Sequence, residues 1–216
     1  MYSRYARSRR KQGAWAADNP GNAAIRKELL SHLLRLAGPE IAGTGLILDA
    51  GCGTGWCLRA LIEAGVQPER LRGIDIQPVR VAAARLTVPG AGIDVGDARR
   101  LPFQDESFAV VLQLTLLSSL GSHQAIREAL GEGMRVLAPG GLLLIYEPRV
   151  PNPLNRHTVL VREGDLDAAG GRRREEVSLT LLPALARRLG GRTEHRYGRL
   201  ARFPFLRTHR LIACRA

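Results

Sequence analysis

Two acidic side chains and a glycine cluster stand where short apolar runs of the sequence end. In the stretch LILDAGCGTGW, residues 46–56, three apolar residues are followed by Asp49, then by Ala50 and three glycines in five positions. Asp75 ends a second run, LRGID. Glycine permits a turn with positive φ and lets a ligand lie against the backbone. A helix that follows such a loop offers free N–H groups to a carboxylate or a phosphate. The stretch therefore predicts a cofactor-binding loop.

The residues of this loop argue against two cofactor classes. In the dinucleotide fingerprint GxGxxG, Gly51 and Gly53 match, but the third position is Trp56, which is too large for close helix–strand packing. Gly55 makes the pattern GxGxG instead. No GK[ST] follows, so the phosphate-binding P-loop is excluded as well.

Asp75 lies 26 residues beyond Asp49, at the end of the second predicted strand. An acid at that position can accept hydrogen bonds from both ribose hydroxyls of a cofactor, in nicotinamide and S-adenosylmethionine sites alike. The alternative is a capping role before the helix start at Gln77-Pro78.

Short apolar runs alternate with helical patterns along most of the chain. This succession predicts an α/β fold with a Rossmann-like, seven-stranded, mostly parallel sheet and helices on both faces. We expect irregular structure over 148–158 and a mobile, Gly-rich loop over 164–176. The expected strands are 46–50, 71–76, 91–96, 107–114, 142–147, 192–199 and 208–214, and the expected helices are 23–37, 55–65, 78–86, 123–136 and 177–189.

The length of 216 residues fits one domain. We divide it into a basic N-terminal segment with a cap helix (1–43), a cofactor-binding core (44–147) and a substrate-side loop, last helix and closing strands (148–216). The net charge of +12 lies entirely at the two ends: residues 1–11 carry +5, residues 172–216 carry +9, and the segment between them carries −2. This distribution indicates a solvated surface, an anionic substrate or an anionic membrane surface near the termini.

Three cysteines without CxxC spacing indicate a reducing compartment and no structural zinc. No apolar h-region follows the basic start, so a secretory signal is not expected, although an Arg- and Ser-rich transit peptide stays an alternative. We expect a cytoplasmic protein. Tyr2, Tyr5 and Trp15 either form a flap over the cofactor or anchor the N-terminal helix.

Four blocks in order resemble one family, the class I S-adenosylmethionine-dependent methyltransferases, within the small-molecule group related to quinone-biosynthesis C-methyltransferases. The blocks span about Leu46 to Glu147 and read LILDAGCGTG, GIDIQP, GDARRLPFQDESFAVVLQ and RVLAPGGLLLIYE. Each block alone is a weak signal, whereas the ordered set is specific. Ala109 departs from the usual aspartate after the Phe of the fourth strand, at a mainly structural position.

The resemblance implies S-adenosylmethionine as the cofactor and a role for nine residues. Asp49, Gly51 and Gly53 would hold its amino-acid end. Asp75 would bind the ribose hydroxyls, and Ile76 would lie against the adenine. Asp97 would accept from the adenine amino group, and the Ala98 N–H would meet a ring nitrogen. Gln113 and Leu114, past the fourth strand, would line the methionine moiety.

Methyl transfer from a sulfonium needs alignment and water exclusion above all, and a general base only for a protonated nucleophile. Ser118 and Ser119 stand where relatives commonly carry His or Glu. Candidate bases are Glu147, whose alternative is an ion pair with Arg149 or a neighbouring arginine, and His123 and His157, whose alternative is a surface role. The catalytic residues therefore stay unassigned.

The sequence thus predicts a methyltransferase acting on a small molecule, with an anionic or lipid-linked acceptor as one option. Peripheral membrane contact through the Arg-rich ends is a further hypothesis. The charge favours a nucleic-acid methyltransferase as the alternative, but the stretch Gln113–Leu116 lacks the Asn/Asp-Pro-Pro-aromatic tetrad of base-amine methylation. Two further hypotheses are a catalytically degenerate cofactor-binding protein and a nicotinamide oxidoreductase; the cofactor acids argue against the first, and Trp56 argues against the second.

Overall fold

The computed structural model describes residues 18–151, 158–170 and 172–216, and the side chains of 172–174 are not described. Tyr2, Tyr5, Trp15 and His157 lie outside these ranges, so the predictions made for them stay predictions.

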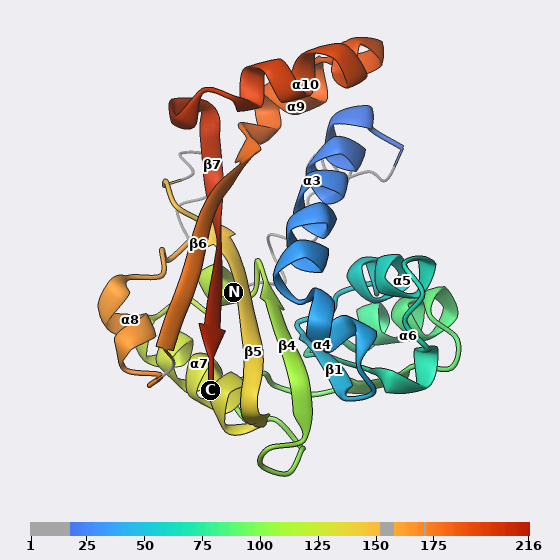
Figure 1. Cartoon of the computed structure of the whole chain (residues 1–216), viewed down its shortest axis with the longest axis vertical. Coiled ribbons are helices and arrows are strands. Elements are labelled where there is room, and N and C mark those ends of the chain that lie inside the picture. The colour runs from blue at the N-terminus through green and yellow to red at the C-terminus, as the bar shows by residue number, and fades with distance from the viewer. Residues whose placement is uncertain (1–17, 152–157, 171) are drawn as a thin grey trace.

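A seven-stranded sheet forms the centre of the molecule, in the order β3-β2-β1-β4-β5-β7-β6 (Figure 1). β7 pairs antiparallel with both of its neighbours, and every other pairing is parallel. The predicted fold class is confirmed. The strands are β1 (Leu46–Ala50), β2 (Leu71–Asp75), β3 (Gly92–Val95), β4 (Phe108–Leu114), β5 (Leu137–Pro148), β6 (Arg172–Leu181) and β7 (Arg207–Arg215).

One face of the sheet is covered by α3 (Pro20–Leu36), α5 (Trp56–Glu63) and α6 (Pro78–Thr87). The Asn19 side chain begins α3, because its Oδ1 accepts from the N–H groups of Gly21 at 2.9 Å and Asn22 at 3.3 Å. The helix expected over 23–37 ends at Leu36, and Gly38 and Pro39 open a further short helix, α4 (Gly38–Ala42). Short 3-10 helices are η2 (Pro68–Arg70), η3 (Leu117–Ser119), η4 (Gly190–Arg192) and η5 (Pro204–Leu206).

The opposite face is covered by α7 (His123–Arg135) and α8 (Glu163–Asp167). Ile126, Ala129 and Leu130 of α7 are fully buried against the sheet. Both faces of the central strands are thereby shielded from water, which explains why β4 is nearly all apolar.

The C-terminal third corrects three sequence predictions. The expected loop over 164–176 contains α8 and the first half of β6. The expected helix over 177–189 is the second half of β6 followed by a short α9 (Pro183–Arg188), and the expected strand over 192–199 is α10 (Thr193–Ala201). In addition, β5 begins at Leu137, before the Pro-Gly-Gly sequence that we expected to precede the strand.

Residues 182–206, which we call the tip, connect β6 to β7 beyond the carboxyl ends of the parallel strands (Figure 1). The tip contains α9, α10 and η5 and packs on the N-terminal half of α3 around a small apolar core. No helix in the described part of the chain is both long and apolar enough to cross a bilayer.

Candidate active site

The three predicted cofactor acids lie at the carboxyl-terminal side of the parallel strands. Asp49 lies in β1, Asp75 is the last residue of β2, and Asp97 follows β3. In open α/β sheets, ligands bind outside the carboxyl ends of the strands, at the point where the strand order reverses. Here the order reverses between β1 and β4, beside the glycine loop.

The glycine loop has the backbone that its sequence predicts. Gly53 has φ +57°, and a Cβ placed there would meet no atom within 4 Å, so the loop presents bare backbone to open space. Gly55 has φ +82°, and a Cβ there would lie 2.7 Å from Val88 Cγ2 of the segment after α6. Gly55 therefore permits the close packing that a third fingerprint glycine provides elsewhere. Trp56 begins α5 and is only partly buried.

Asp49 has the electrostatics of a cation-binding residue. Its carboxyl is buried, and Oδ1 has no hydrogen-bond partner among the described residues. Burial, and secondly the nearby Asp75 charge, raise its pKa to about 7. A buried carboxylate oxygen without a donor is costly unless a ligand satisfies it. The α-ammonium group of S-adenosylmethionine is such a donor, so the implied cofactor fits this residue.

Asp75 has the capping role that the sequence left open, and its ribose-binding role stays a prediction. Its Oδ1 accepts from the Gln77 N–H at 2.8 Å, which is the capping role, and its Oδ2 accepts from the Gly53 N–H at 3.0 Å. The second bond fastens the glycine loop to the end of β2. Each carboxylate oxygen has a further acceptor position, so Asp75 can still take the ribose hydroxyls that the resemblance assigns to it.

Exposed apolar side chains lie beside these acids. Ile76 is 61% exposed and Val95, at the end of β3, is 50% exposed. An adenine ring between them would remove both from water. The Ala98 N–H has no acceptor within the described residues, which suits its predicted bond to a ring nitrogen. Val95 is a candidate contact that the sequence reasoning did not single out.

Asp97 is already paired in this structure. Arg99 Nη2 lies 2.5 Å from Asp97 Oδ2, and this pairing holds the pKa of Asp97 below its usual range. The carboxyl therefore stays ionised across the neutral range, and the predicted bond to the adenine amino group would be shared with Arg99. The GDARR sequence contained this signal, an arginine two residues after the acid.

Gln113 and Leu114 lie within β4 and not past it, contrary to the sequence prediction. The Gln113 side chain is fully buried and donates to the Ala129 carbonyl of α7 at 2.7 Å, away from the glycine loop. Leu114 is buried in the core under α3. The strand end is occupied by Thr115, which has a φ of +54°, and by Leu116, whose Cδ1 lies 2.9 Å from where a Gly51 Cβ would stand.

Glu147 is buried and its carboxylate is used structurally. Oε1 accepts from the Leu117 N–H at 2.6 Å, and Oε2 accepts from the Ser118 N–H at 3.2 Å. It does not pair with Arg149, which donates instead to Ser178 Oγ. Burial raises the pKa of Glu147 to about 7. The contacts favour a role in holding the segment after β4, and they do not favour the predicted base.

His123, the second candidate base, is also engaged elsewhere. Its Nδ1 lies 2.7 Å from Oδ2 of Asp165, whose Oδ1 accepts from Arg127 Nη1 at 3.1 Å. Asp165 is itself buried. This cluster fastens α7 to α8, which makes His123 a structural residue in this arrangement.

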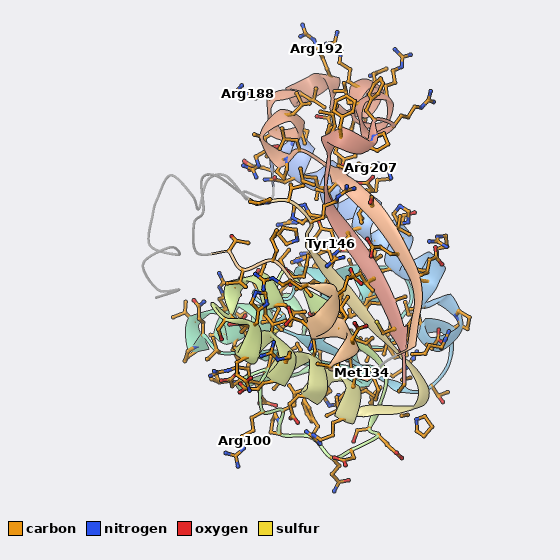
Figure 2. The ribbon with its side chains drawn as sticks, turned by 90° about the vertical axis from the view of Figure 1, so that its left-hand side faces the viewer. Arg100, Met134, Tyr146, Arg188, Arg192 and Arg207 are labelled. Carbon is orange, nitrogen blue, oxygen red and sulfur yellow. The ribbon has the colours of Figure 1, made fainter. Side chains whose placement is uncertain are left out.

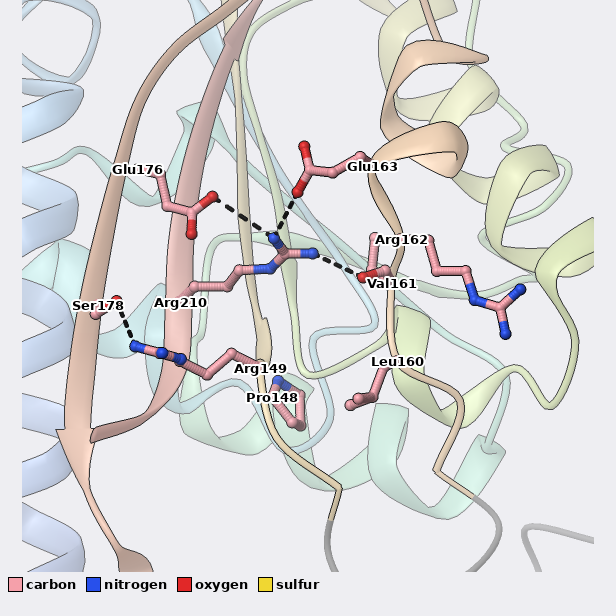
Figure 3. A pocket seen from close by; sticks show the side chains of 9 residues that line it. All are labelled: Pro148, Arg149, Leu160, Val161, Arg162, Glu163, Glu176, Ser178 and Arg210. Atoms are coloured by element: carbon pink, nitrogen blue, oxygen red, sulfur yellow. Dashed lines mark hydrogen bonds and ion pairs between the residues drawn. The ribbon is translucent and has the colours of Figure 1, made fainter. Parts of the chain in front are cut away.

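An open cavity of about 510 Å³ lies beyond the end of β5 (Figure 3). Figure 3 shows the Arg210 guanidinium between Glu163 and Glu176, and the Arg162 guanidinium directed away from them. Arg149 contacts only the neutral Ser178 hydroxyl within the described residues, so its charge is not balanced there. The cavity lining is Pro148, Arg149, Leu160, Val161, Arg162, Glu163, Glu176, Ser178 and Arg210.

Comparison with known proteins agrees with this geometry. Residues 48–145 match a family described as Methyltransferase domain. A demethylmenaquinone methyltransferase of Chlorobaculum parvum is 35% identical over 53% of this chain and 46% of its own. A phthiotriol/phenolphthiotriol dimycocerosates methyltransferase of Mycobacterium tuberculosis is 34% identical over 64% of this chain and 49% of its own. The chain thus spans about half the length of the curated relatives it matches.

The fold has counterparts among solved structures. The N-methyltransferase NodS from Bradyrhizobium japonicum, in complex with S-adenosyl-L-homocysteine, superposes with a TM-score of 0.67 at 20% identity, over 92% of this chain and 89% of NodS. The fold and the matched segment are those of the class I S-adenosylmethionine-dependent methyltransferases. Within that class, the matched segment is similar to the group related to the quinone-biosynthesis C-methyltransferases.

The affinity for S-adenosylhomocysteine is expected to fall as the pH drops below about 7. The Asp49 carboxyl of the free protein has a pKa of about 7, and only its ionised form pairs with the ligand ammonium. Below that pKa, affinity should fall by up to about tenfold per pH unit. Isothermal titration from about pH 5 to 8 measures this slope, and Asp49→Asn should flatten it. A pH-independent affinity would contradict the pairing.

Proposed function

We propose that this protein transfers the methyl group of S-adenosylmethionine to a small-molecule acceptor that carries an anionic or lipid-linked group. The observation that carries the proposal is the buried Asp49 oxygen without a donor among the described residues, beneath a glycine loop that presents bare backbone and is tied to Asp75. The cofactor supplies an activated methyl on a sulfonium with a neutral thioether as the leaving group.

The residues of this chain supply positioning and exclusion of water. Asp49 and Asp75 would fix the two ends of the cofactor, and the segment held by Glu147 would cover the methyl-bearing side from the end of β4. Alignment of two reactants can lower the activation barrier by about 7–11 kcal/mol. Because both described candidate bases are engaged structurally, we favour an acceptor that is already nucleophilic or that loses its proton to solvent.

The Arg149 cavity supports an anionic group on the acceptor. It lies past the end of β5, and the Arg149 charge has no acidic partner among the described residues. An arginine can hold a carboxylate or a phosphate through two parallel N–H bonds. The names of the two curated relatives, which mention demethylmenaquinone and phthiotriol dimycocerosates, support a lipid-linked acceptor.

The acceptor is found by incubating the protein with methyl-labelled S-adenosylmethionine and either a lipid and small-molecule extract or RNA from the same cells. We expect label in the small-molecule fraction, whereas label in RNA alone would overturn the proposal.

Once the acceptor is identified, Arg149→Gln should raise the KM for the acceptor by roughly tenfold or more, with the affinity for S-adenosylhomocysteine unchanged. Arg162→Gln is the matched control, because its guanidinium points away from the cavity (Figure 3). Equal effects of the two variants would exclude the Arg149 site.

A further inference from the structure

The tip exposes large apolar side chains at one end of the molecule. Phe205 is 80% exposed and Phe203 is 49% exposed, and their ring centroids lie 5.7 Å apart. Leu182 of the same segment is also exposed. Scattered single apolar residues are normal on protein surfaces, but a group of three within one small unit indicates an interaction surface.

The same unit is strongly basic. Residues 182–206 contain six arginines and one glutamate, a net charge of +5. Figure 2 shows Arg188 and Arg192 at this end of the molecule, with Arg100 at the opposite end. Five of the six arginines are exposed and have no acidic partner within the described ranges; these are Arg188, Arg192, Arg196, Arg199 and Arg202.

The exposed side chains belong to a tip that is held in place by hydrogen bonds and by its own apolar core. Glu28 Oε2 accepts from the Tyr197 hydroxyl at 2.7 Å and from the Thr180 N–H at 2.9 Å, and thereby joins α3, α10 and β6. Arg207 Nε donates to the Ala201 carbonyl at 2.6 Å at the base of the tip. Tyr197 and Ala201 are buried in the tip core. The two phenylalanines are therefore presented by a fixed scaffold and not by a frayed end.

The position of the tip relates it to the candidate active site. It projects beyond the carboxyl ends of β4 and β5, which is the edge of the sheet that carries the cofactor residues (Figure 1). A surface contacted by the tip would therefore face the end of the molecule from which an acceptor enters.

We infer that the tip docks the protein on an anionic lipid bilayer surface. Arginines near a bilayer are attracted by anionic headgroups, and exposed aromatic side chains enter the region between headgroups and acyl chains. RNA would use the positive charge as well, but three exposed apolar side chains among the arginines favour the bilayer interface. The inference does not depend on methyl transfer, because lipid binding is measured without cofactor or acceptor.

Co-sedimentation of the full chain with vesicles tests this inference. Vesicles of phosphatidylcholine mixed with phosphatidylglycerol should bind the protein, and pure phosphatidylcholine vesicles should bind it at least about tenfold more weakly. Arg192→Gln with Arg196→Gln should reduce partitioning to the anionic vesicles at least about tenfold, since each arginine contributes on the order of fivefold. Phe205→Ser should reduce it by about tenfold through the lost apolar contact.

Matched controls separate the tip from the overall charge and from folding. Arg59→Gln with Arg100→Gln makes the same charge change outside the tip, and Leu86→Ser replaces another exposed apolar residue on α6. Both should leave vesicle binding within about twofold, and unchanged binding of S-adenosylhomocysteine shows that each variant is folded. Equal binding to both vesicle types, equal effects of tip and control variants, or tip-dependent binding of RNA without vesicle binding would each overturn the inference.

Discussion

Asp49→Asn should weaken S-adenosylhomocysteine binding by roughly 10- to 100-fold and at the same time stabilise the free protein. The affinity falls because a hydrogen bond between an ammonium and a buried carboxylate contributes about 1.5–3 kcal/mol. Stability rises because the free protein holds a buried, ionised carboxyl whose Oδ1 has no donor among the described residues.

The sign of the stability change follows from the pKa of Asp49. Folding raises this pKa from 3.8 to about 7, so the carboxyl destabilises the folded state progressively between about pH 4 and 7 and fully above that range. The shift corresponds to roughly 4 kcal/mol as an upper bound. The asparagine amide that replaces the carboxyl also needs hydrogen-bond partners, which offsets part of this gain. We therefore expect Asp49→Asn to have a melting temperature about 2–6 °C above that of the wild-type protein near pH 8.

Asp94→Asn is the matched control, since Asp94 is an exposed acid of β3 that pairs with Arg85. It should change the melting temperature and the affinity very little. A loss of both stability and affinity in Asp49→Asn would mean that Asp49 is a structural residue of the free protein. Unchanged affinity would remove the carboxylate from the cofactor site.

Glu147→Ala should destabilise the protein strongly, whereas Glu147→Gln should not. Alanine leaves the buried N–H groups of Leu117 and Ser118 without an acceptor, which costs about 1–3 kcal/mol for each group. We expect a fall in melting temperature of roughly 6–12 °C. Glutamine keeps one acceptor and removes a buried charge, so its effect should stay near zero.

The pair of Glu147 variants also separates a structural role from a catalytic one. Glu147→Gln should retain the affinity for S-adenosylhomocysteine and keep kcat within a few-fold, because the carboxyl is fully buried and held by two N–H groups. A normal melting temperature combined with a loss of kcat of about 10² or more would instead identify Glu147 as the general base.

The first two thirds of the fold follow from local patterns, and the C-terminal third does not. Buried apolar runs and glycine loops identified β1 to β5 because each is bounded by clear turn residues. Leu181, Leu185 and Leu189 have helical spacing, yet Leu179 and Leu181 lie buried in β6. Residues 177–181 form a strand because they pair with β7, and a contact between segments so far apart in the sequence cannot be seen in a local pattern.

For α10 the error was the opposite one, because a strand was predicted over 192–199 where the structure has a helix. Its buried residues Thr193, Tyr197 and Ala201 recur every four positions, which is a helical period that the strand prediction overlooked. Position 198 is glycine, and the segment carries several charged residues, so its apolar pattern is sparse.

The part of the candidate site that could be predicted is the part in which acidic residues and glycines stand at the ends of apolar runs. Asp49, Asp75 and the glycine loop lie together as expected. Gln113 was misplaced because a one-residue difference along a strand turns a side chain to the other face. The partners of Glu147 and His123 lie 30 and 42 residues away in the sequence, so their engagement could not be read from spacing.

Titration of the wild-type protein with S-adenosylhomocysteine, with NADH as the comparison, tests the central claim most directly. At neutral pH we predict saturable binding of S-adenosylhomocysteine, a higher melting temperature in its presence, and no measurable binding of NADH. If S-adenosylhomocysteine neither binds nor stabilises the protein, or if NADH binds in its place, the assignment of the glycine loop and Asp49 to a sulfonium cofactor is wrong.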